Sequence, residues 1–298
     1  ATTISEDTTI SNETYTSSGD DENALRVEAA TVKLNEITVN KSGGSSSNTE
    51  NGDFYGMNAG LLAVSGATVT IDDADISTNA VNGNGVFSYG EGTVVNIANS
   101  KIRTTLNNSG GIQTTGGGTT NASNLDVETQ GNSSAAIRSD RGGGTVNVTG
   151  GKYVTNGTGS PAIYCTADIT VTDAALTANA SEGVVVEGKN SVSLNNCTVT
   201  GSMTGTYNGD SDENIHCIMI YQSMSGDAAV GEASFSAKGG SITSNAGDMF
   251  YITNTDCQID LEDVDFTLAN DTFLRVEGNS SSRGWGTEGE NGGDVVLN

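Results

Sequence analysis

The chain has 298 residues, of which 40 are Gly and one is Pro, and 34% of the residues are hydrophobic. This composition has less Leu and less charge than a typical α/β domain, and it predicts an all-β chain rich in turns. The formal net charge of −25 disfavours binding to nucleic acid and to anionic membranes, because both would be repelled. No run of about 18 apolar residues is present, and we therefore expect no membrane insertion.

A short unit recurs along the chain. In order, it reads TVTIDDADIST (68–78), VVNIANSKIRT (94–104), TVNVTGGKYVT (145–155), DITVTDAALTA (168–178), SVSLNNCTVTG (191–201) and CQIDLEDVDFT (257–267). Each unit holds two short alternating stretches around a residue type that tolerates a left-handed backbone. We expect a sharp corner between two strands at Glu36, Asp73, Asn99, Asn124, Gly150, Asp173, Asn196, Gly239 and Asp263.

A second family of short strands precedes these units. Its members are ALRVE (24–28), LLAVS (61–65), VFSY (86–89), GIQTT (111–115), AIRSD (136–140), AIYCT (162–166), VVVEG (184–188), CIMIY (217–221), MFYIT (249–253) and FLRVE (273–277). Each period thus holds three strands, and such periods of roughly 22–26 residues are typical of a parallel β-helix. We expect about ten coils, in which each coil buries the apolar face of its neighbour.

The Asn-containing corner between two short strands resembles the right-handed parallel β-helix of the pectate-lyase-like superfamily. Stretches such as GNGVFSYGEGT, AAIRSDRGGGT and EGNSSSRGWGT also resemble adhesin-like β-helix proteins of gut Firmicutes. The resemblance implies one right-handed β-helix domain over residues 1–298, located outside the cell or on the surface of a Gram-positive bacterium. We expect residues 1–23 to cap the N-terminal end. The final GDVVLN matches only one strand of a coil, and we therefore expect the native helix to continue past Asn298.

Two sets of small polar residues are expected to face inward. The cysteines Cys165, Cys197, Cys217 and Cys257 lack CxxC spacing, which makes a zinc site improbable. Their even number permits disulfides, but their place in the repeat favours buried free thiols. By the same parity, the recurring Thr78, Thr104, Thr129 and Thr155 point toward the interior.

Two columns of side chains are expected to face outward from the first of the three sheets. One column reads Arg26, Ala63, Phe87, Gln113, Arg138, Tyr164, Val185, Met219, Tyr251 and Arg275. The other reads Glu28, Ser65, Tyr89, Thr115, Asp140, Thr166, Glu187, Tyr221, Thr253 and Glu277. Exposed rings on a flat sheet are suited to stacking against sugars, although aromatic residues also favour strands by propensity alone.

Four connecting segments are long: 41–59, 202–216, 223–231 and 278–292. Long loops on a rigid scaffold often carry function, and these would wall a groove along the first sheet, especially over its last coils. We therefore expect a ligand site formed by Tyr164, Tyr221, Tyr251, Trp285, Arg283, Tyr207, Arg138 and Glu187.

No catalytic residue or cofactor is assigned. NGDSDEN (208–214) offers Asp210, Asp212 and Glu213 as candidate calcium ligands, but the EF-hand pattern is absent and a solvated acidic turn explains the stretch better. The paired-Asp motif of the pectin hydrolases is absent, and His216 is the only His. A Ser nucleophile elbow is absent too.

The sequence thus predicts a secreted or cell-surface, adhesin-like protein that binds a glycan or polysaccharide without catalysis. One alternative is a polysaccharide lyase or glycoside hydrolase that uses the Arg138–Asp140 region. Another is a structural stalk or filament, in which exposed sheet edges at the ends allow end-to-end self-association.

Overall fold

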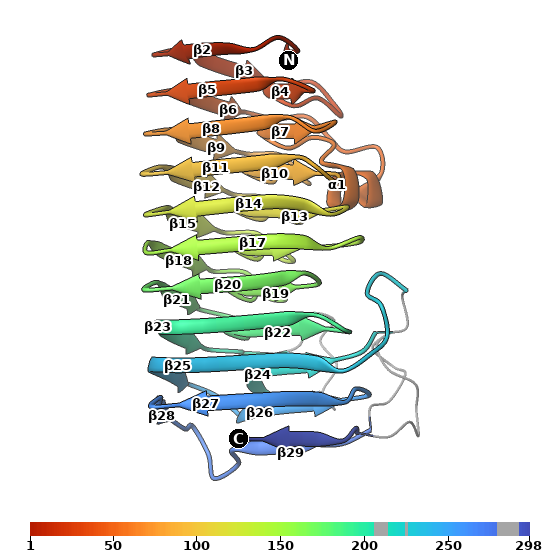
Figure 1. Cartoon of the computed structure of the whole chain (residues 1–298), viewed down its shortest axis with the longest axis vertical. Helices are drawn as coiled ribbons and strands as arrows, with labels where there is room; N and C mark the ends of the chain where they lie inside the picture. The colour runs from red at the N-terminus through yellow and green to blue at the C-terminus, as the bar shows by residue number, and fades with distance from the viewer. Residues whose placement is uncertain (206–213, 224–225, 279–291) are drawn as a thin grey trace.

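The computed structural model describes residues 1–205, 214–223, 226–278 and 292–298. Over these ranges the chain forms a right-handed parallel β-helix, whose short strands stack coil upon coil along one axis (Figure 1). Every strand pairs in parallel with its equivalent in the next coil, as β8 (Thr68–Asp72) does with β11 (Val94–Ala98). The predicted fold class is confirmed.

Each coil contributes one strand to each of three faces, except that the last coil has no strand on the third face within the described residues. The first sheet comprises β1 (Thr2–Ile4), β4 (Leu25–Glu28), β7 (Leu61–Val64), β10 (Val86–Tyr89), β13 (Ile112–Thr115), β16 (Ile137–Ser139), β19 (Ile163–Cys165), β22 (Val184–Glu187), β24 (His216–Tyr221), β26 (Asp248–Thr253) and β29 (Leu274–Val276). The second sheet comprises β2 (Thr8–Ser11), β5 (Thr31–Asn35), β8, β11, β14 (Gly118–Ser123), β17 (Gly144–Thr149), β20 (Asp168–Thr172), β27 (Cys257–Glu262) and β30 (Val295–Leu297). The third sheet comprises β3 (Thr14–Ser17), β6 (Thr38–Lys41), β9 (Asp75–Thr78), β12 (Lys101–Thr104), β15 (Asp126–Thr129), β18 (Lys152–Thr155), β21 (Ala175–Ala178) and β28 (Asp265–Thr267). Two longer strands, β23 (Ser191–Gly201) and β25 (Ala233–Ser244), run through the corner and join the second and third sheets.

The corner between the second and third sheets lies at the predicted residues. All nine have a left-handed backbone, with φ between 50° at Asn99 and 67° at Gly239. Side-chain amides stack along this corner, where Asn124 Nδ2 donates to Asn99 Oδ1 at 2.9 Å and Asn99 Nδ2 donates to Asp72 Oδ1 at 2.8 Å. The repeat therefore lets polar side chains of successive coils hydrogen-bond to one another along the corner.

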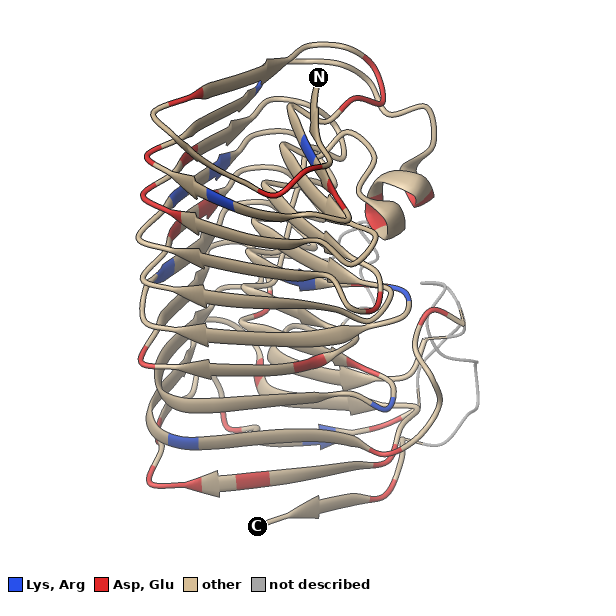
Figure 2. Ribbon diagram, turned by 45° about the horizontal axis from the view of Figure 1, so that its top comes forward, with Lys and Arg blue, Asp and Glu red and all other residues tan. Residues whose placement is uncertain are grey.

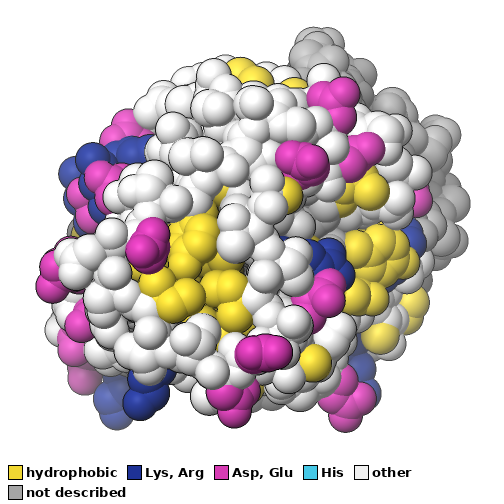
Figure 3. All heavy atoms as spheres, turned by 90° about the horizontal axis from the view of Figure 1, so that it is seen from above, with side chains coloured by type: hydrophobic (Ala, Val, Ile, Leu, Met, Phe, Trp, Pro, Cys, Tyr) yellow, Lys and Arg dark blue, Asp and Glu magenta, His cyan; other side chains and the backbone are white. Residues whose placement is uncertain are grey.

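Residues 1–23, which we expected to cap the helix, contain a coil of their own. β1, β2 and β3 pair in parallel with β4, β5 and β6. The corner of this coil is at Asn12, with φ 59°. Apolar side chains lie at the centre of this end of the molecule (Figure 3), where Ile4 and Ile10 pack, partly buried, against the core.

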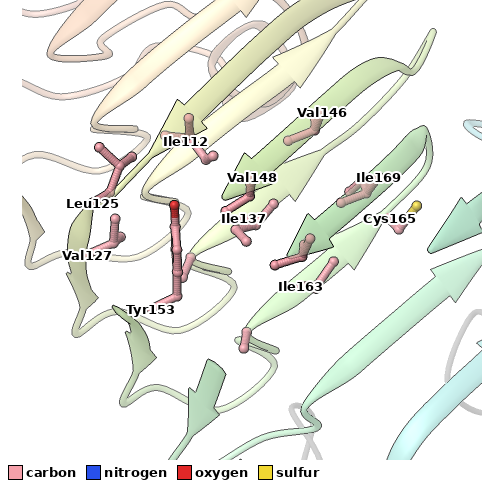
Figure 4. Close-up of a cluster of buried hydrophobic side chains, with 14 of the residues drawn as sticks. Ile112, Leu125, Val127, Ile137, Val146, Val148, Tyr153, Ile163, Cys165 and Ile169 are labelled. Atoms are coloured by element: carbon pink, nitrogen blue, oxygen red, sulfur yellow. The ribbon is translucent and has the colours of Figure 1, made fainter. Parts of the chain in front are cut away.

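Alternate residues of the strands build one continuous core. Ile112, Ile137 and Ile163 lie one above another on the first sheet and face Val146 and other residues of the second sheet (Figure 4). Tyr153 reaches inward from the third sheet and is fully buried. Stacking of the coils thus buries the apolar side chains that a single coil would leave exposed.

The Thr column points inward, as predicted, and closes the turn after the third sheet. Thr104 Oγ1 donates to the carbonyl oxygen of Ser109 at 2.6 Å, and Thr129 Oγ1 donates to that of Ser134 at 2.6 Å. The backbone amide of Ser109 donates in turn to Ser134 Oγ at 2.9 Å. These buried hydroxyls satisfy the backbone of the turn from one coil to the next.

All four cysteines are free and buried, which confirms the prediction. Burial raises the pKa of the Cys165 and Cys217 thiols to about 12. These side chains therefore act as small core residues rather than as nucleophiles.

The outward columns of the first sheet are correct except in the second of the predicted coils. Leu62, and not Ala63, pairs with Arg26 and Phe87, while Ala63 packs in the main core. In the other column Val64 takes the place predicted for Ser65. LLAV has four apolar residues in succession, so it lacks the alternation of apolar and polar residues that indicates register. A shift by one residue exchanges the inward-facing and outward-facing side chains.

Candidate functional site

Segment 41–59 places a short helix beside β10 and β13 (Figure 1). α1 (Thr49–Tyr55) begins after Asn48, whose side chain accepts a hydrogen bond from the backbone amide of Asn51. It ends at Gly56, which has φ 76°. An Asn cap and a left-handed Gly are common start and stop signals of a helix. Since α1 has only seven residues, its contacts with the sheet decide its position.

Hydrogen bonds from side chains of the β-helix hold α1 in place. Gln113 Nε2 donates to the carbonyl oxygen of Asp53 at 2.9 Å, and Thr115 Oγ1 donates to that of Phe54 at 2.6 Å. Asn82 Nδ2 donates to Asp53 Oδ1 at 2.9 Å. The helix thus covers outward-facing residues of the first sheet, and acidic residues lie on it (Figure 2).

A pocket of about 280 Å³ opens between α1, the strands β16 and β19, and the segment at Asp227. Its charged and aromatic lining consists of Asp53, Phe54, Arg138, Asp140, Tyr164 and Asp227. Two of the four long segments, 41–59 and 223–231, therefore wall the first sheet as we expected. They meet over its middle strands, however, and not over the last coils.

Arg138 lies at the centre of the pocket's ion pairs. Its Nη2 is 3.1 Å from Asp53 Oδ1 and 3.4 Å from Asp140 Oδ2, and the residue is only 7% exposed. Burial by itself would lower the pKa of Arg138, but Asp53 and Asp140 outweigh burial and raise it. Its Nη1 is buried and has no hydrogen-bond partner. The site therefore offers a charged, desolvated donor.

Asp140 behaves differently from an exposed carboxyl. Burial raises its pKa to about 7, although Arg138 acts in the opposite direction. The backbone amide of Arg141 donates to Asp140 Oδ1 at 3.0 Å. At neutral pH the pocket thus contains a carboxyl group that readily gains or loses a proton.

Arg141 joins the two walls of the pocket. Its Nη2 is 2.7 Å from Asp227 Oδ1, and its guanidinium carbon lies 4.0 Å from the centroid of the Phe54 ring. The cation–π contact and the ion pair connect α1 with the segment at Asp227. One face of the Phe54 ring is therefore already occupied.

A buried cluster of hydroxyl groups holds Glu187 next to Tyr164. Tyr164 Oη and Ser223 Oγ donate to the Glu187 carboxylate, and Tyr221 Oη donates to it at 3.0 Å. Burial is the main cause that raises the pKa of both tyrosines well above the usual value, so both remain donors. The sequence prediction placed Tyr164, Tyr221 and Glu187 in one site, and the structure brings them together as an internal network.

The expectation that the rings of the first sheet are exposed is wrong for Phe87, Tyr221 and Tyr251. Tyr221 is 9% exposed and Tyr251 only 2%. The Tyr251 ring stacks on His216 with 5.0 Å between centroids. Packed side chains and connecting segments cover this face, so these rings form no open platform for a sugar.

A second buried polar cluster surrounds His216. Its Nε2 lies 3.1 Å from Glu182 Oε1 and its Nδ1 lies 3.2 Å from Asn214 Oδ1. The Asn214 amide group donates to Asp248 Oδ2 at 3.0 Å, which fixes its oxygen toward the ring. Both ring nitrogens of His216 therefore lie within hydrogen-bond distance of an oxygen, one of them the carboxyl oxygen of the buried Glu182.

Six residues of the sequence prediction lie outside the described residues: Tyr207, Arg283, Trp285, Asp210, Asp212 and Glu213. Within the described ranges, no group of three His, Cys, Asp or Glu side chains is arranged to hold a metal ion. The structure adds Asp53, Phe54, Asp140 and Asp227 to the predicted Arg138 and Tyr164. For Asp53, Phe54 and Asp227, the only signal in the sequence was the length of the segments that contain them, 41–59 and 223–231.

Another hollow, of about 860 Å³, follows the corner between the second and third sheets. Its charged side chains are exposed and pair with one another, as Lys101 Nζ does with Asp75 Oδ2 at 3.9 Å. Opposite charges alternate along this edge of the molecule (Figure 2). Because its lining has no buried charged side chain, this hollow is a weaker candidate than the pocket at Arg138.

Comparison of the chain with protein-family models, curated proteins and solved structures gave no match. In the part of the chain that the structure describes, no helix has the length and apolar character needed to cross a membrane.

Proposed function

We propose that this protein binds a carbohydrate without catalysis and that the pocket at Arg138 is the binding site. One observation carries the proposal: Arg138 is 7% exposed, lines the pocket and has an Nη1 without a hydrogen-bond partner. A buried donor without a partner is costly, and a ligand oxygen would remove that cost.

The rest of the lining supports a ligand rich in hydroxyl groups. The carboxyl groups of Asp53, Asp140 and Asp227 can accept hydrogen bonds from hydroxyls, while Arg138 donates. Phe54 and Tyr164 add apolar ring surface to the same small pocket. A few polar groups that converge within a partly apolar hollow are typical of small-molecule sites.

The proposal includes a biological setting. An acidic β-helix with such a pocket suits an adhesin-like protein that is secreted or displayed on a bacterial surface, in line with its resemblance to adhesin-like β-helix proteins of gut Firmicutes. The glycan would then be of host or dietary origin. The proposal includes no cofactor, and it adds end-to-end association of the rods through their exposed sheet edges.

A second candidate function is glycoside hydrolysis. It is favoured by Asp140, whose pKa of about 7 suits a general acid, and by Asp53, which shares the Arg138 nitrogen with it. In this alternative Asp140 would protonate the leaving oxygen, while the Asp53 carboxylate would take a proton from the water that attacks the anomeric carbon.

Binding and turnover can be separated in one experiment. A glycan array with the purified protein should identify bound structures, and each bound glycan is then incubated with protein and assayed for new reducing or unsaturated ends. Binding without new ends supports the proposal, and new ends that disappear in Asp140→Asn support hydrolysis. Failure to bind any carbohydrate would favour a structural stalk.

A further inference from the structure

The pocket at Arg138 carries more negative than positive charge. Its lining contains three carboxyl groups, on Asp53, Asp140 and Asp227, and one guanidinium group, on Arg138. Arg141 adds a second guanidinium from the rim, where it is paired with Asp227. A ligand that enters therefore meets an excess of acceptors.

Glu187 increases this excess. Its carboxylate lies directly behind Tyr164, which donates a hydrogen bond to it, and it is only 2% exposed. In the part of the chain that the structure describes, the hydrogen bonds to Glu187 come from uncharged hydroxyls, those of Tyr164, Tyr221 and Ser223. The charge of the buried Glu187 therefore acts across the pocket with little screening by solvent.

Among the fully buried side-chain atoms of the lining residues, the one without a hydrogen-bond partner is a donor. Arg138 Nη1 lacks a partner, whereas Asp53 Oδ1 already accepts from Arg138 and Asn82. The ligand must therefore bring an acceptor oxygen to Arg138 and donors to the carboxylates. A hydroxyl group does both, since it has one proton and two lone pairs.

A carboxylate on the ligand would bind to Arg138 less favourably than a hydroxyl group would. The guanidinium already contacts two carboxyl groups, so an anionic ligand would be a third negative group at one buried cation. Like charges at short range in a desolvated site are repulsive, and the added charge would lack a full partner.

We infer that the pocket takes one uncharged sugar ring and discriminates against the matching uronic acid. This inference rests on the proposed carbohydrate binding. The volume of about 280 Å³ lies just below the usual range of roughly 300–1,000 Å³ for ligand pockets, which suits a single ring.

Protonation of Asp140 makes the preference for neutral over acidic sugars depend on pH. Asp140 directly follows β16, and its pKa is about 7. The titratable and charged groups around it are Arg138 on β16, Asp53 on α1, Tyr164 on β19, Glu187 on β22 and Tyr221 on β24. At pH 5 a protonated Asp140 removes one negative charge and becomes a donor. Discrimination against an acidic sugar is therefore weaker at pH 5 than at pH 8.

The test compares matched pairs of methyl glycosides: hexose against hexuronate in the gluco, galacto and manno series. Binding to the full chain is measured by calorimetry at pH 8 and pH 5. We expect the neutral member of a bound pair to bind at least tenfold more tightly at pH 8 and the ratio to shrink at pH 5. Asp53→Asn should also reduce the ratio, because it removes a negative charge and keeps the acceptor oxygen.

Two results would count against these ideas in different ways. Equal or tighter binding of the uronate, abolished by Arg138→Met, would overturn the inference and leave the proposed function intact. Absence of binding by every glycoside, or binding unaffected by Arg138→Met, would overturn both. Arg26→Met is the matched control, since Arg26 lies in the same column of the first sheet and outside the pocket.

Discussion

Arg138 on β16 and Asp53 on α1 form a buried ion pair, with 3.1 Å between Nη2 and Oδ1. The pair connects the rigid β-helix to a helix of seven residues that has little stability of its own. It also gives the pocket its most buried cation. One contact therefore both positions the wall of the site and sets its chemistry.

The first prediction concerns this ion pair. Asp53→Ala should loosen α1 without unfolding the coils beneath it, because the coil strands pair independently of the helix. The substitution removes one partner of a buried guanidinium, and we expect a local cost of about 1–3 kcal/mol. Faster hydrogen exchange confined to residues 49–55 would confirm this.

The control for this prediction is Asp75→Ala. Asp75 forms an exposed pair with Lys101 at 3.9 Å, and its loss should change stability by less than about 1 kcal/mol. Equal effects of the two substitutions on exchange at 49–55 would contradict the role given to Asp53.

Asp140 should make the protein less stable as pH rises. Its pKa is about 7 in the folded protein and 3.8 when the side chain is exposed, as in the unfolded chain. Between these two pH values Asp140 therefore holds its proton only in the folded state. The free energy of unfolding therefore falls between about pH 4 and pH 7. In Asp140→Asn this part of the pH dependence disappears, which urea denaturation at pH 5 and pH 8 measures. An unchanged difference between the two pH values would show that Asp140 is not a buried acid.

Glu182 should act in the opposite direction. Burial alone would raise its pKa, but the contacts with His216 and Ser181 outweigh burial and lower it below 4.5. Its contribution to stability is therefore present above that value and is lost as pH falls through the folded pKa. Glu182→Gln should cost about 1–2 kcal/mol at pH 6 and flatten the loss of stability between pH 5 and pH 3. Parallel pH profiles of the two proteins would rule out this account.

The hydrogen-bonded Asn and Asp side chains at the corner between the second and third sheets offer a test of the fold. Asn124 combines a φ of 51° with a hydrogen bond to Asn99, so Asn124→Ala loses both the left-handed preference and the bond. We expect a cost of about 1–2 kcal/mol. Asn124→Gly keeps the backbone freedom and should cost less. A larger loss for Gly than for Ala in chemical denaturation would mean that the backbone conformation is not the limiting factor.

The coils were predictable because few residue types fit their corners. Asn, Asp and Gly tolerate φ values near 50°, and the sequence places one of them at almost every corner, so their spacing revealed the period. LLAV at residues 61–64 carried no alternation, and its register came out wrong for that reason.

The site was predictable only in part. Arg138, Tyr164 and Glu187 lie on regular strands, and parity placed them on one face. The docking of α1 depends on Gln113 and Thr115 donating to its carbonyl oxygens, a contact that leaves no pattern in sequence. Sequence reasoning therefore expected open rings where the folded chain has covered ones.

Titration of neutral glycosides into the unmodified protein and into Arg138→Met tests the central claim most directly. The account predicts a saturable heat of binding for at least one neutral sugar, retained by Arg26→Met and lost by at least tenfold in Arg138→Met. Binding of equal strength in Arg138→Met, with the fold intact by circular dichroism, would contradict it.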